Sequence, residues 1–239
     1  MNDNPKLLFL DIEWKPAQAF VWQLYDVNVA VNQLIDQGGL LCVAAKFMGE
    51  RKCHFFSEWA DGAEGMAAGI HALIDQADAV ITYNGDKYDL PKLQGAFLLA
   101  GLMPPAPVTS IDLYKAVKKL GFLSNKLALI GPLLTGESKV KHEGMDLWVK
   151  VLKGDPKAQK RMEKYCVQDT RMLEPLYLKV RPYITTHPHL GTVSRYSCGA
   201  CGSSRIQSRG VRRTKASYTQ RLHCQACGSW QDGKRVKAA

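Results

Sequence analysis

Apolar residues gather in short runs through the first half of the chain, and their spacing predicts β-strands. Residues 7–14, LLFLDIEW, have the composition of a buried strand, and residues 79–84, AVITYN, read as a shorter one. Residues 40–48 and 52–59 predict a hairpin, because a glycine-containing turn separates two β-rich runs. These runs predict the strands of a central sheet.

Apolar residues at helical spacing predict helices between and after these strands. We expect helices over about 63–76, from Asp89 to about residue 102 with Asp89 as its N-cap, over most of 114–134, and over about 156–180. Two further runs have strand character, FVWQLYDV near residue 20 as part of a meander and APVTSIDL before residue 114. Strands followed by alternating strands and helices predict an α/β fold, a mixed sheet flanked by helices.

Length and composition limit the class of protein. A chain of 239 residues with 46% hydrophobic and 23% charged residues is long enough for one sizeable core and a small appendage. No apolar run approaches the roughly 18 residues that cross a bilayer. The opening segment carries acids where a signal peptide carries bases. We therefore expect no membrane contact and a cytoplasmic protein of a bacterium or a phage-infected cell.

Charge divides the chain into two parts. From Ile184 onward, ten Lys and Arg residues face the single acid Asp232, which leaves the first 183 residues nearly neutral. The segment RPYITTHPHLGTVSR has no helical or strand period and reads as a connection. We expect one domain over residues 1–183, a linker over 184–194 and a basic domain over 195–239. A basic tail of this kind indicates a polyanionic partner, with nucleic acid first, although a solubilising surface gives the same charge.

Three acidic motifs lie at informative places on the predicted elements. Asp11 and Glu13 alternate along the first strand, so they share one face about 7 Å apart at roughly 3.3 Å per residue. Asp89 follows the strand 79–84 in NGDKYD, where an N-cap role also explains it. Asp169 lies within the apolar stripe of the last helix, one turn after Tyr165. Solvated acids, or a basic partner for Asp169, are the alternatives to a metal site.

The order of these motifs resembles that of the DEDDy exonucleases. That family combines D-x-E on a first strand, N-x-x-x-[FY]-D before a helix and Y-x-x-x-D on a late helix. Here the matching segments are LDIEW, YNGDKYDLP and YCVQDTRML, over roughly residues 7–180. Each motif alone is weak, and the ordered set of three is specific. The resemblance implies an RNase H-like fold.

The same resemblance implies the chemistry of the site. Asp11, Glu13, Asp89 and Asp169 would hold two Mg²⁺ or Mn²⁺ ions, since hard carboxylate oxygens suit these ions. Tyr165 and Glu13 would orient the attacking water, and Asn84 would contact substrate. The 3′→5′ direction and the release of nucleoside monophosphates also come from the family alone. Lys139 and Lys141 could touch phosphates or lie in a solvated loop, and His142 reads as a loop histidine.

Four of the seven cysteines form two C-x-x-C pairs in the basic tail. Cys198 and Cys201 are separated from Cys224 and Cys227 by residues 202–223, and a glycine follows each pair. In a cytosolic chain this pattern predicts one tetrahedral zinc ion before it predicts disulfides or a redox dithiol. The segment looks like a zinc ribbon whose metal is structural, because about 45 residues with few large apolar side chains cannot support a core.

Between the two pairs lies an arginine-rich stretch that carries an aromatic residue. Arg212, Arg213, Lys215 and Tyr218 are candidate contacts for substrate, through phosphate binding and base stacking. Trp230 follows the second pair and is a further aromatic residue, and packing over the zinc site would also explain Tyr218 and Trp230.

These features lead to one function and its alternatives. We predict a metal-dependent 3′→5′ exonuclease that hydrolyses DNA single strands or 3′ ends. An exoribonuclease is the alternative within the same chemistry, and a structure-selective endonuclease is a more distant one. The alternative from another class is a non-catalytic nucleic-acid-binding or protein-binding adaptor. The sequence does not identify a protein partner.

Overall fold

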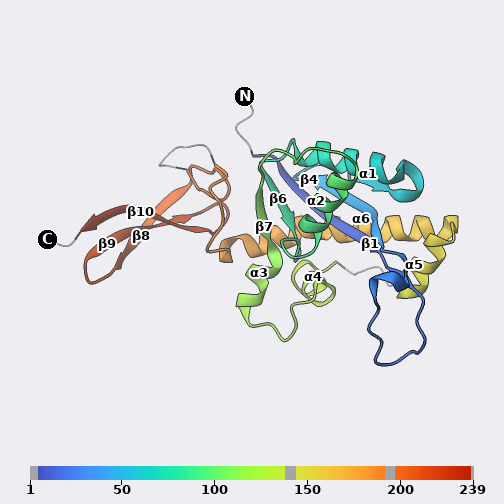
Figure 1. Ribbon diagram of the computed structural model, residues 1–239. Helices are drawn as coiled ribbons and strands as arrows, with labels where there is room; N and C mark the ends of the chain where they lie inside the picture. The colour runs from blue at the N-terminus through green and yellow to red at the C-terminus, as the bar shows by residue number, and fades with distance from the viewer. Residues whose placement is uncertain (1–4, 138–143, 192–196, 238–239) are drawn as a thin grey trace.

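The computed structural model describes residues 5–137, 144–191 and 197–237, and a five-stranded mixed sheet lies at its centre (Figure 1). The strands run in the order β5-β4-β1-β6-β7, with β1 antiparallel to β4 and parallel to β6. Lys139, Lys141 and His142 lie outside the described residues. The strands of this sheet are β1 Leu7–Lys15, β4 Gly39–Phe47, β5 His54–Ser57, β6 Ala79–Thr82 and β7 Thr109–Asp112.

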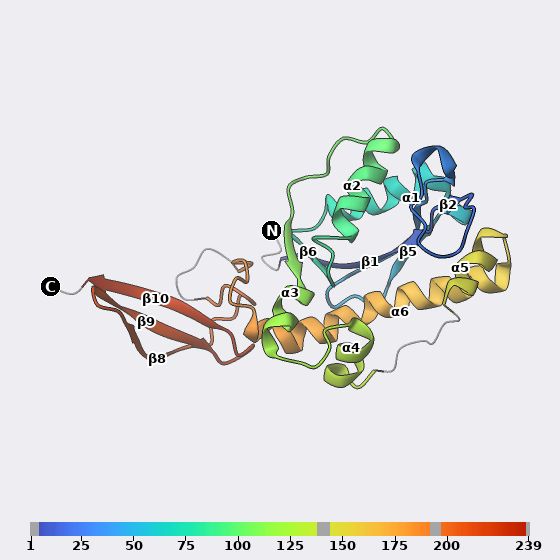
Figure 2. The same ribbon diagram turned by 60° about the horizontal axis from the view of Figure 1, so that its bottom comes forward.

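Helices cover both faces of this sheet, as Figure 2 shows. One apolar core joins the sheet to α1 and α2, and two further cores join the opposite face to α3, α4, α5 and α6. The mixed α/β sheet flanked by helices that the sequence predicts is therefore confirmed. The helices are α1 Glu58–Ile74, α2 Asp89–Leu99, α3 Leu113–Val117, α4 Leu127–Thr135, α5 Met145–Leu152 and α6 Pro156–Val180.

The last helix, α6, has the bounds that its sequence pattern predicts. The Asp155 side chain accepts a hydrogen bond from Lys157 N at 2.9 Å, and Pro156 occupies the first turn. Helix α1 differs, since it begins at Glu58 and bends at Gly62, where φ is +69°. The Asp61 carboxylate accepts a hydrogen bond from Ser57 N at 2.7 Å, which ends β5 at Ser57 rather than at residue 59.

The prediction of a meander near residue 20 is wrong. Only the short strands β2 Gln18–Ala19 and β3 Leu34–Asp36 pair with each other, and the chain between them is a loop with the 3₁₀ turn Val31–Gln33. Both edges of β1 are already occupied, by β4 and β6, so this segment has no place beside it in the sheet. Its apolar side chains are exposed, and Trp22 is 99% exposed.

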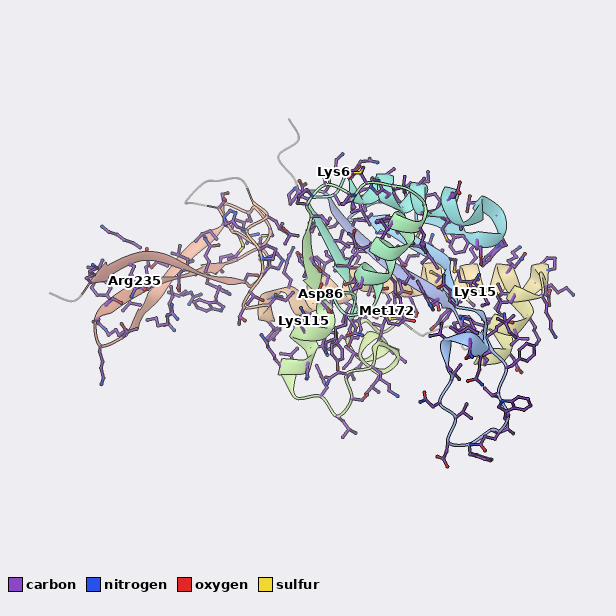
Figure 3. The ribbon with its side chains drawn as sticks, in the orientation of Figure 1. Lys6, Lys15, Asp86, Lys115, Met172 and Arg235 are labelled. Atoms are coloured by element: carbon purple, nitrogen blue, oxygen red, sulfur yellow. The ribbon has the colours of Figure 1, made fainter. Side chains whose placement is uncertain are left out.

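Lys15 at the end of β1 holds the base of this loop. Its ammonium group lies 3.4 Å from the Asp36 carboxylate and 2.9 Å from that of Glu58, which joins the loop to α1. Figure 3 shows Lys15 where the ribbon leaves the sheet for the loop.

A second, three-stranded sheet follows α6 in the order β10-β9-β8. A 3₁₀ turn, Arg181–Tyr183, ends α6, and residues 184–191 contain neither helix nor strand. Ile184 and Leu190 pack against the core that contains α6, and Leu190 N donates to Gly199 O at 2.6 Å. The domain bounds 1–183, 184–194 and 195–239 stay predictions. The strands are β8 Ile206–Arg213, β9 Ser217–Cys224 and β10 Trp230–Lys237.

Candidate active site

The alternation of β1 decides which way its two acids point. Leu8, Leu10 and Ile12 belong to the core beneath α1 and α2, whereas Leu7 and Phe9 belong to the core against α6. Asp11 and Glu13 continue the second series, so they face the layer that contains α6. Both side chains are half-buried, and a register shift directly after Glu13 bends the strand there.

A tight turn after β6 brings Asp89 to the same region. Asn84 has a positive φ of 69°, and its backbone N–H donates to the Asp112 carboxylate at 2.7 Å. A Cβ at Gly85 would collide with the Thr82 side chain, so the turn requires glycine there. The half-buried Asn84 has a backbone reason to be asparagine, since this residue tolerates the left-handed region. Its substrate contact stays a prediction.

The prediction that Asp89 is an N-cap is wrong. Tyr88 holds that position, and Asp89 is the first residue of α2. The Asp89 carboxylate instead accepts a hydrogen bond from Ile12 N on β1 at 3.3 Å, and the residue is only 4% exposed. The turn therefore directs this acid into the protein, beside the part of β1 that lies between Asp11 and Glu13.

Helix α6 brings Asp169, which is 4% exposed, against the sheet. One turn earlier, the Cys166 thiol donates to the carbonyl oxygen of Asp11 at 3.6 Å. The neighbouring Thr170 hydroxyl donates to Ala44 O on β4 at 3.3 Å. These contacts fix the segment of α6 that contains Asp169 alongside the segment of β1 that contains Asp11.

The pKa values of two tyrosines respond to the charges of the four acids. Burial raises the pKa of Tyr165, and the charges of Asp169, Glu13 and Asp11 raise it further. Burial also raises the pKa of Tyr88, with contributions from Glu13, Asp89 and Asp11. The structure thus brings together Asp11, Glu13, Asp89, Asp169 and Tyr165. The Trp148 ring packs edge-on against Tyr165 at 6.4 Å between centroids.

The surroundings of Asp89 disfavour the charged form of its carboxyl group. Burial raises the pKa of Asp89 to about 7, against the lowering effect of hydrogen bonds from the N–H groups of Ile12 and Asp89 itself. The charge of Asp112 raises it, and that of Lys92 lowers it. Carboxylate oxygens are the donor set that hard divalent ions prefer, so these acids fit Mg²⁺ or Mn²⁺.

Lys92 is a residue of this region that the sequence interpretation did not include. Its ammonium nitrogen lies 3.5 Å from the centroid of the Trp14 ring and 4.3 Å from that of Tyr88. Lys92 follows Asp89 by three residues on α2, and that helical spacing is the signal that could have identified it. It supplies a fixed positive charge at the edge of the site.

Replacing Asp89 with asparagine is expected to stabilise the metal-free protein at pH 8 by on the order of 2–4 kcal/mol. The pKa of Asp89 in the folded protein is about 7, above its value of 3.8 in the unfolded chain. The native carboxyl group therefore lowers the free energy of unfolding as the pH rises from the unfolded pKa to the folded pKa. Thermal unfolding in a chelating buffer measures the difference. The exposed Glu64→Gln on α1 is the control. A less stable Asp89→Asn variant would contradict uncompensated charge at this position.

The cysteines of the basic tail form a separate cluster. The Sγ atoms of Cys198, Cys201, Cys224 and Cys227 all lie within 4.8 Å of one another. The Cys198–Cys227 and Cys201–Cys224 sulfur distances are 3.6 and 3.7 Å. A tetrahedral zinc ion with Zn–S bonds of about 2.3 Å spaces its sulfurs by about 3.8 Å, so the cluster could hold zinc.

The two halves of this cluster have the same backbone design. Gly202 N donates to Cys198 O at 2.8 Å, and Gly228 N donates to Cys224 O at 3.0 Å. Both glycines have positive φ, as such tight turns require. Burial raises the pKa of Cys227, but hydrogen bonds with Ser229, Cys201 and Cys198 together outweigh it and bring the pKa to about 7, which favours the thiolate that binds metal.

The four predicted substrate contacts of the tail do not share one surface. Arg213 pairs with Tyr218 across β8 and β9, whereas Arg212 pairs with Thr219. Neighbouring residues of a strand point to opposite faces, so Arg212 lies on the face opposite Arg213 and Tyr218. Lys215 is exposed in the turn between the two strands.

The fold and the first site define an RNase H-like protein. Residues 8–181 match the family model of the RNase_H superfamily, and the chain therefore belongs to this superfamily. The RNase H-like fold that the sequence resemblance implies is confirmed. In the described part of the chain, no helix is both long and apolar enough to span a membrane.

The fold of this chain is also similar to part of a solved structure. The chain is similar to the family B DNA polymerase from the hyperthermophilic archaeon Pyrobaculum calidifontis, with a TM-score of 0.58 and 15% sequence identity. The similarity covers 74% of this chain and 25% of the polymerase, so the chain spans about a quarter of that protein, and the likeness concerns the fold. A comparison with curated proteins gives no match.

Proposed function

We propose that this protein is a metal-dependent 3′→5′ exonuclease of the DEDDy type that hydrolyses DNA single strands or 3′ ends. The observation that carries the proposal is the convergence of four acids and a tyrosine from β1, the turn before α2, and α6. These residues are Asp11, Glu13, Asp89, Asp169 and Tyr165. The RNase_H superfamily match supports nuclease chemistry, and the fold shared with a DNA polymerase supports DNA as the substrate.

The four acids would hold two Mg²⁺ or Mn²⁺ ions. When bound, such ions lower the pKa of the attacking water and offset negative charge on the leaving oxygen. The protein contributes a rigid frame for them, because Asp11 and Glu13 lie on a central strand and Asp169 on a helix packed against it. Asp89 joins them through its hydrogen bond with the backbone of β1.

Tyr165 is suited to orient the attacking water or a phosphate oxygen. Burial and the neighbouring acids raise its pKa, so the phenol keeps its proton at physiological pH and remains a hydrogen-bond donor. Its half-buried ring is held by Trp148, which limits the orientations of the hydroxyl group. Glu13 would accept a hydrogen bond from the same water.

We also propose that Cys198, Cys201, Cys224 and Cys227 hold one structural Zn²⁺ and that residues 195–239 form a basic, nucleic-acid-binding zinc ribbon. The sulfur spacing supports a tetrahedral ion. The net positive charge of this part supports a phosphate-bearing partner. Arg212, Arg213, Lys215, Tyr218 and Asn84 remain predicted contacts with that partner.

Incubation with matched 5′-labelled DNA and RNA single strands tests the proposal. We expect a descending ladder in Mg²⁺ or Mn²⁺, no ladder in a chelator and none with Asp11→Ala. A ladder on RNA alone would make the protein an exoribonuclease. If single, duplex and branched strands all survive with both metals, the exonuclease proposal fails, and the non-catalytic adaptor takes its place.

A further inference from the structure

The three-stranded sheet has one face that carries guanidinium and aromatic groups together. Across the strands, Gln207 pairs with His223 and His223 with Trp230, while Arg212 pairs with Thr219 and Thr219 with Arg235. Cross-strand partners share a face, and so do residues two apart on one strand. We name the set Arg212, Arg221, His223, Trp230 and Arg235 the arginine–tryptophan face.

Side-chain contacts agree with this assignment. The Arg212 guanidinium lies 2.6 Å from the Asp232 carboxylate, which joins β8 to β10 over the central strand β9. The Arg221 guanidinium carbon lies 5.8 Å from the centroid of the Trp230 ring. Both contacts require the residues involved to project from the same side of the sheet.

The opposite face is covered at the cysteine end. Cys224 and its partner Ile206 belong to the small apolar cluster around the four cysteines. The Gln231 side chain accepts a hydrogen bond from Gly199 N at 2.9 Å and donates to Ser197 O at 3.1 Å, which ties the loop of the first cysteine pair over that side. At the cysteine end of the sheet, the loop of the first cysteine pair therefore covers the opposite face and leaves the arginine–tryptophan face uncovered.

Trp230 and His223 form a preorganised aromatic platform. Their ring centroids lie 4.6 Å apart with 33° between the ring planes. The Gln225 amide nitrogen donates to His223 Nδ1 at 2.9 Å and fixes that ring. Trp230 is 54% exposed and lies outside the apolar cluster around the cysteines, so packing over a zinc core does not explain it.

Charge on this face suits phosphate. Arg221 lies beside the platform, and Arg212 and Arg235 lie further along the strands. Asp232 is the one acid of the described strands β8, β9 and β10. Arg235 Nε donates to Ser217 Oγ at 3.2 Å, which orients this guanidinium on the outer part of the sheet (Figure 3). Guanidinium groups bind phosphate oxygens in a bidentate manner, and an exposed indole binds the flat face of an unpaired base.

We propose that the arginine–tryptophan face binds single-stranded nucleic acid, with one unpaired base stacked on the Trp230–His223 platform and the flanking phosphates on Arg221 and Arg212. The inference deepens the proposed function, on which it rests for the choice of nucleic acid as partner. A duplex buries the faces of its bases between neighbouring pairs, so the platform selects an unpaired base.

The fold sets where along a strand this base lies. The cysteine end of the sheet abuts the end of α6, since a Cβ at Gly228 would lie 3.5 Å from the Pro182 side chain. Both views show the sheet extending from that end of α6 away from the body (Figures 1 and 2). Asp169 lies about 16 Å before Val180 along the helix, at about 1.5 Å per residue. A strand stacked at about 3.4 Å per nucleotide would need roughly five nucleotides to span this distance, and an extended single strand would need fewer.

Fluorescence anisotropy with labelled 20-nucleotide single strands tests the proposal. The chain carries Asp11→Ala so that the strand survives, and binding is measured at one fixed salt concentration with DNA and with RNA. Trp230→Ala is expected to weaken binding of at least one strand about 5- to 150-fold, whereas Trp230→Phe keeps most of the affinity. On a strand of the same length made of abasic sites, the chain that retains Trp230 and the Trp230→Ala variant are expected to bind equally.

Two results would overturn the proposal. One is an unchanged affinity of Trp230→Ala for every normal strand, and the other is a larger loss from Tyr218→Ala on the opposite face. Unchanged zinc content per chain shows that each variant is folded. Because no strand is cleaved in this assay, absence of nuclease activity in the wild-type protein would remove the proposed function without affecting the binding result.

Discussion

Asp169→Asn is expected to reduce the rate of strand hydrolysis by at least about 10³-fold, because one metal-binding carboxylate supplies several kcal/mol of transition-state stabilisation. The substitution keeps the shape of the side chain and removes its charge. Asp169 is 4% exposed and lies within the apolar stripe of α6. Because the shape of the side chain is kept, we expect the variant to lose activity while it retains the fold.

Single-turnover hydrolysis of a 5′-labelled strand at saturating Mn²⁺ measures this loss. Glu163→Gln is the matched control, since it makes the same acid-to-amide change on an exposed position of α6. We expect Glu163→Gln to hydrolyse the strand at the wild-type rate. Activity of Asp169→Asn within tenfold of the wild type would mean that the metals are held without this residue.

Cys224→Ser is expected to release one zinc ion per chain and to unfold the three-stranded sheet. The apolar cluster of this part contains Ala200 and Ile206 beside the four cysteines, so little core remains without the metal. A structural zinc site contributes roughly 10–16 kcal/mol of apparent binding free energy, which is folding free energy for such a module. We expect amide hydrogens of β8, β9 and β10 to lose their protection from exchange, while those of β1 and β4 keep it.

The free cysteine Cys53 supplies the control for this experiment. It is half-buried beside the central sheet and lies outside the cysteine cluster, so Cys53→Ser should keep its zinc. Hydrogen exchange read by mass spectrometry, together with metal analysis, compares the two variants. If the β8–β10 amides of zinc-free Cys224→Ser remain protected, the sheet is stable without metal and the structural role assigned to zinc is wrong.

Much of the body was predictable because local periodicity decides it. The alternation along β1 and the helical stripe of α6 each place acids on a definite face, and both elements occur where the pattern predicts them. The exposed loop around Trp22 was not predictable in this way, since its composition suits a strand. It fails to become one because β4 and β6 already occupy both edges of β1, which is a property of the whole sheet.

The candidate active site was likewise predictable only in part. Sequence order and residue type were enough to single out Asp11, Glu13, Asp89 and Asp169. The hydrogen bond between Asp89 and β1, and the position of Lys92 between two aromatic rings, depend on how α2 packs on the sheet. No spacing along the chain encodes such contacts, because they join elements that are far apart in sequence.

The sequence by itself determined which side chains are candidates for chemistry, namely the acids, Tyr165 and the paired cysteines, and on which kind of element each one lies. Tertiary structure decided which of them meet, how far burial raises the pKa of Asp89, and that Arg212 and Tyr218 belong to opposite faces of one small sheet. The physical reason is that periodicity acts over a few residues, whereas burial, charge compensation and the choice of the open face arise from contacts between distant segments.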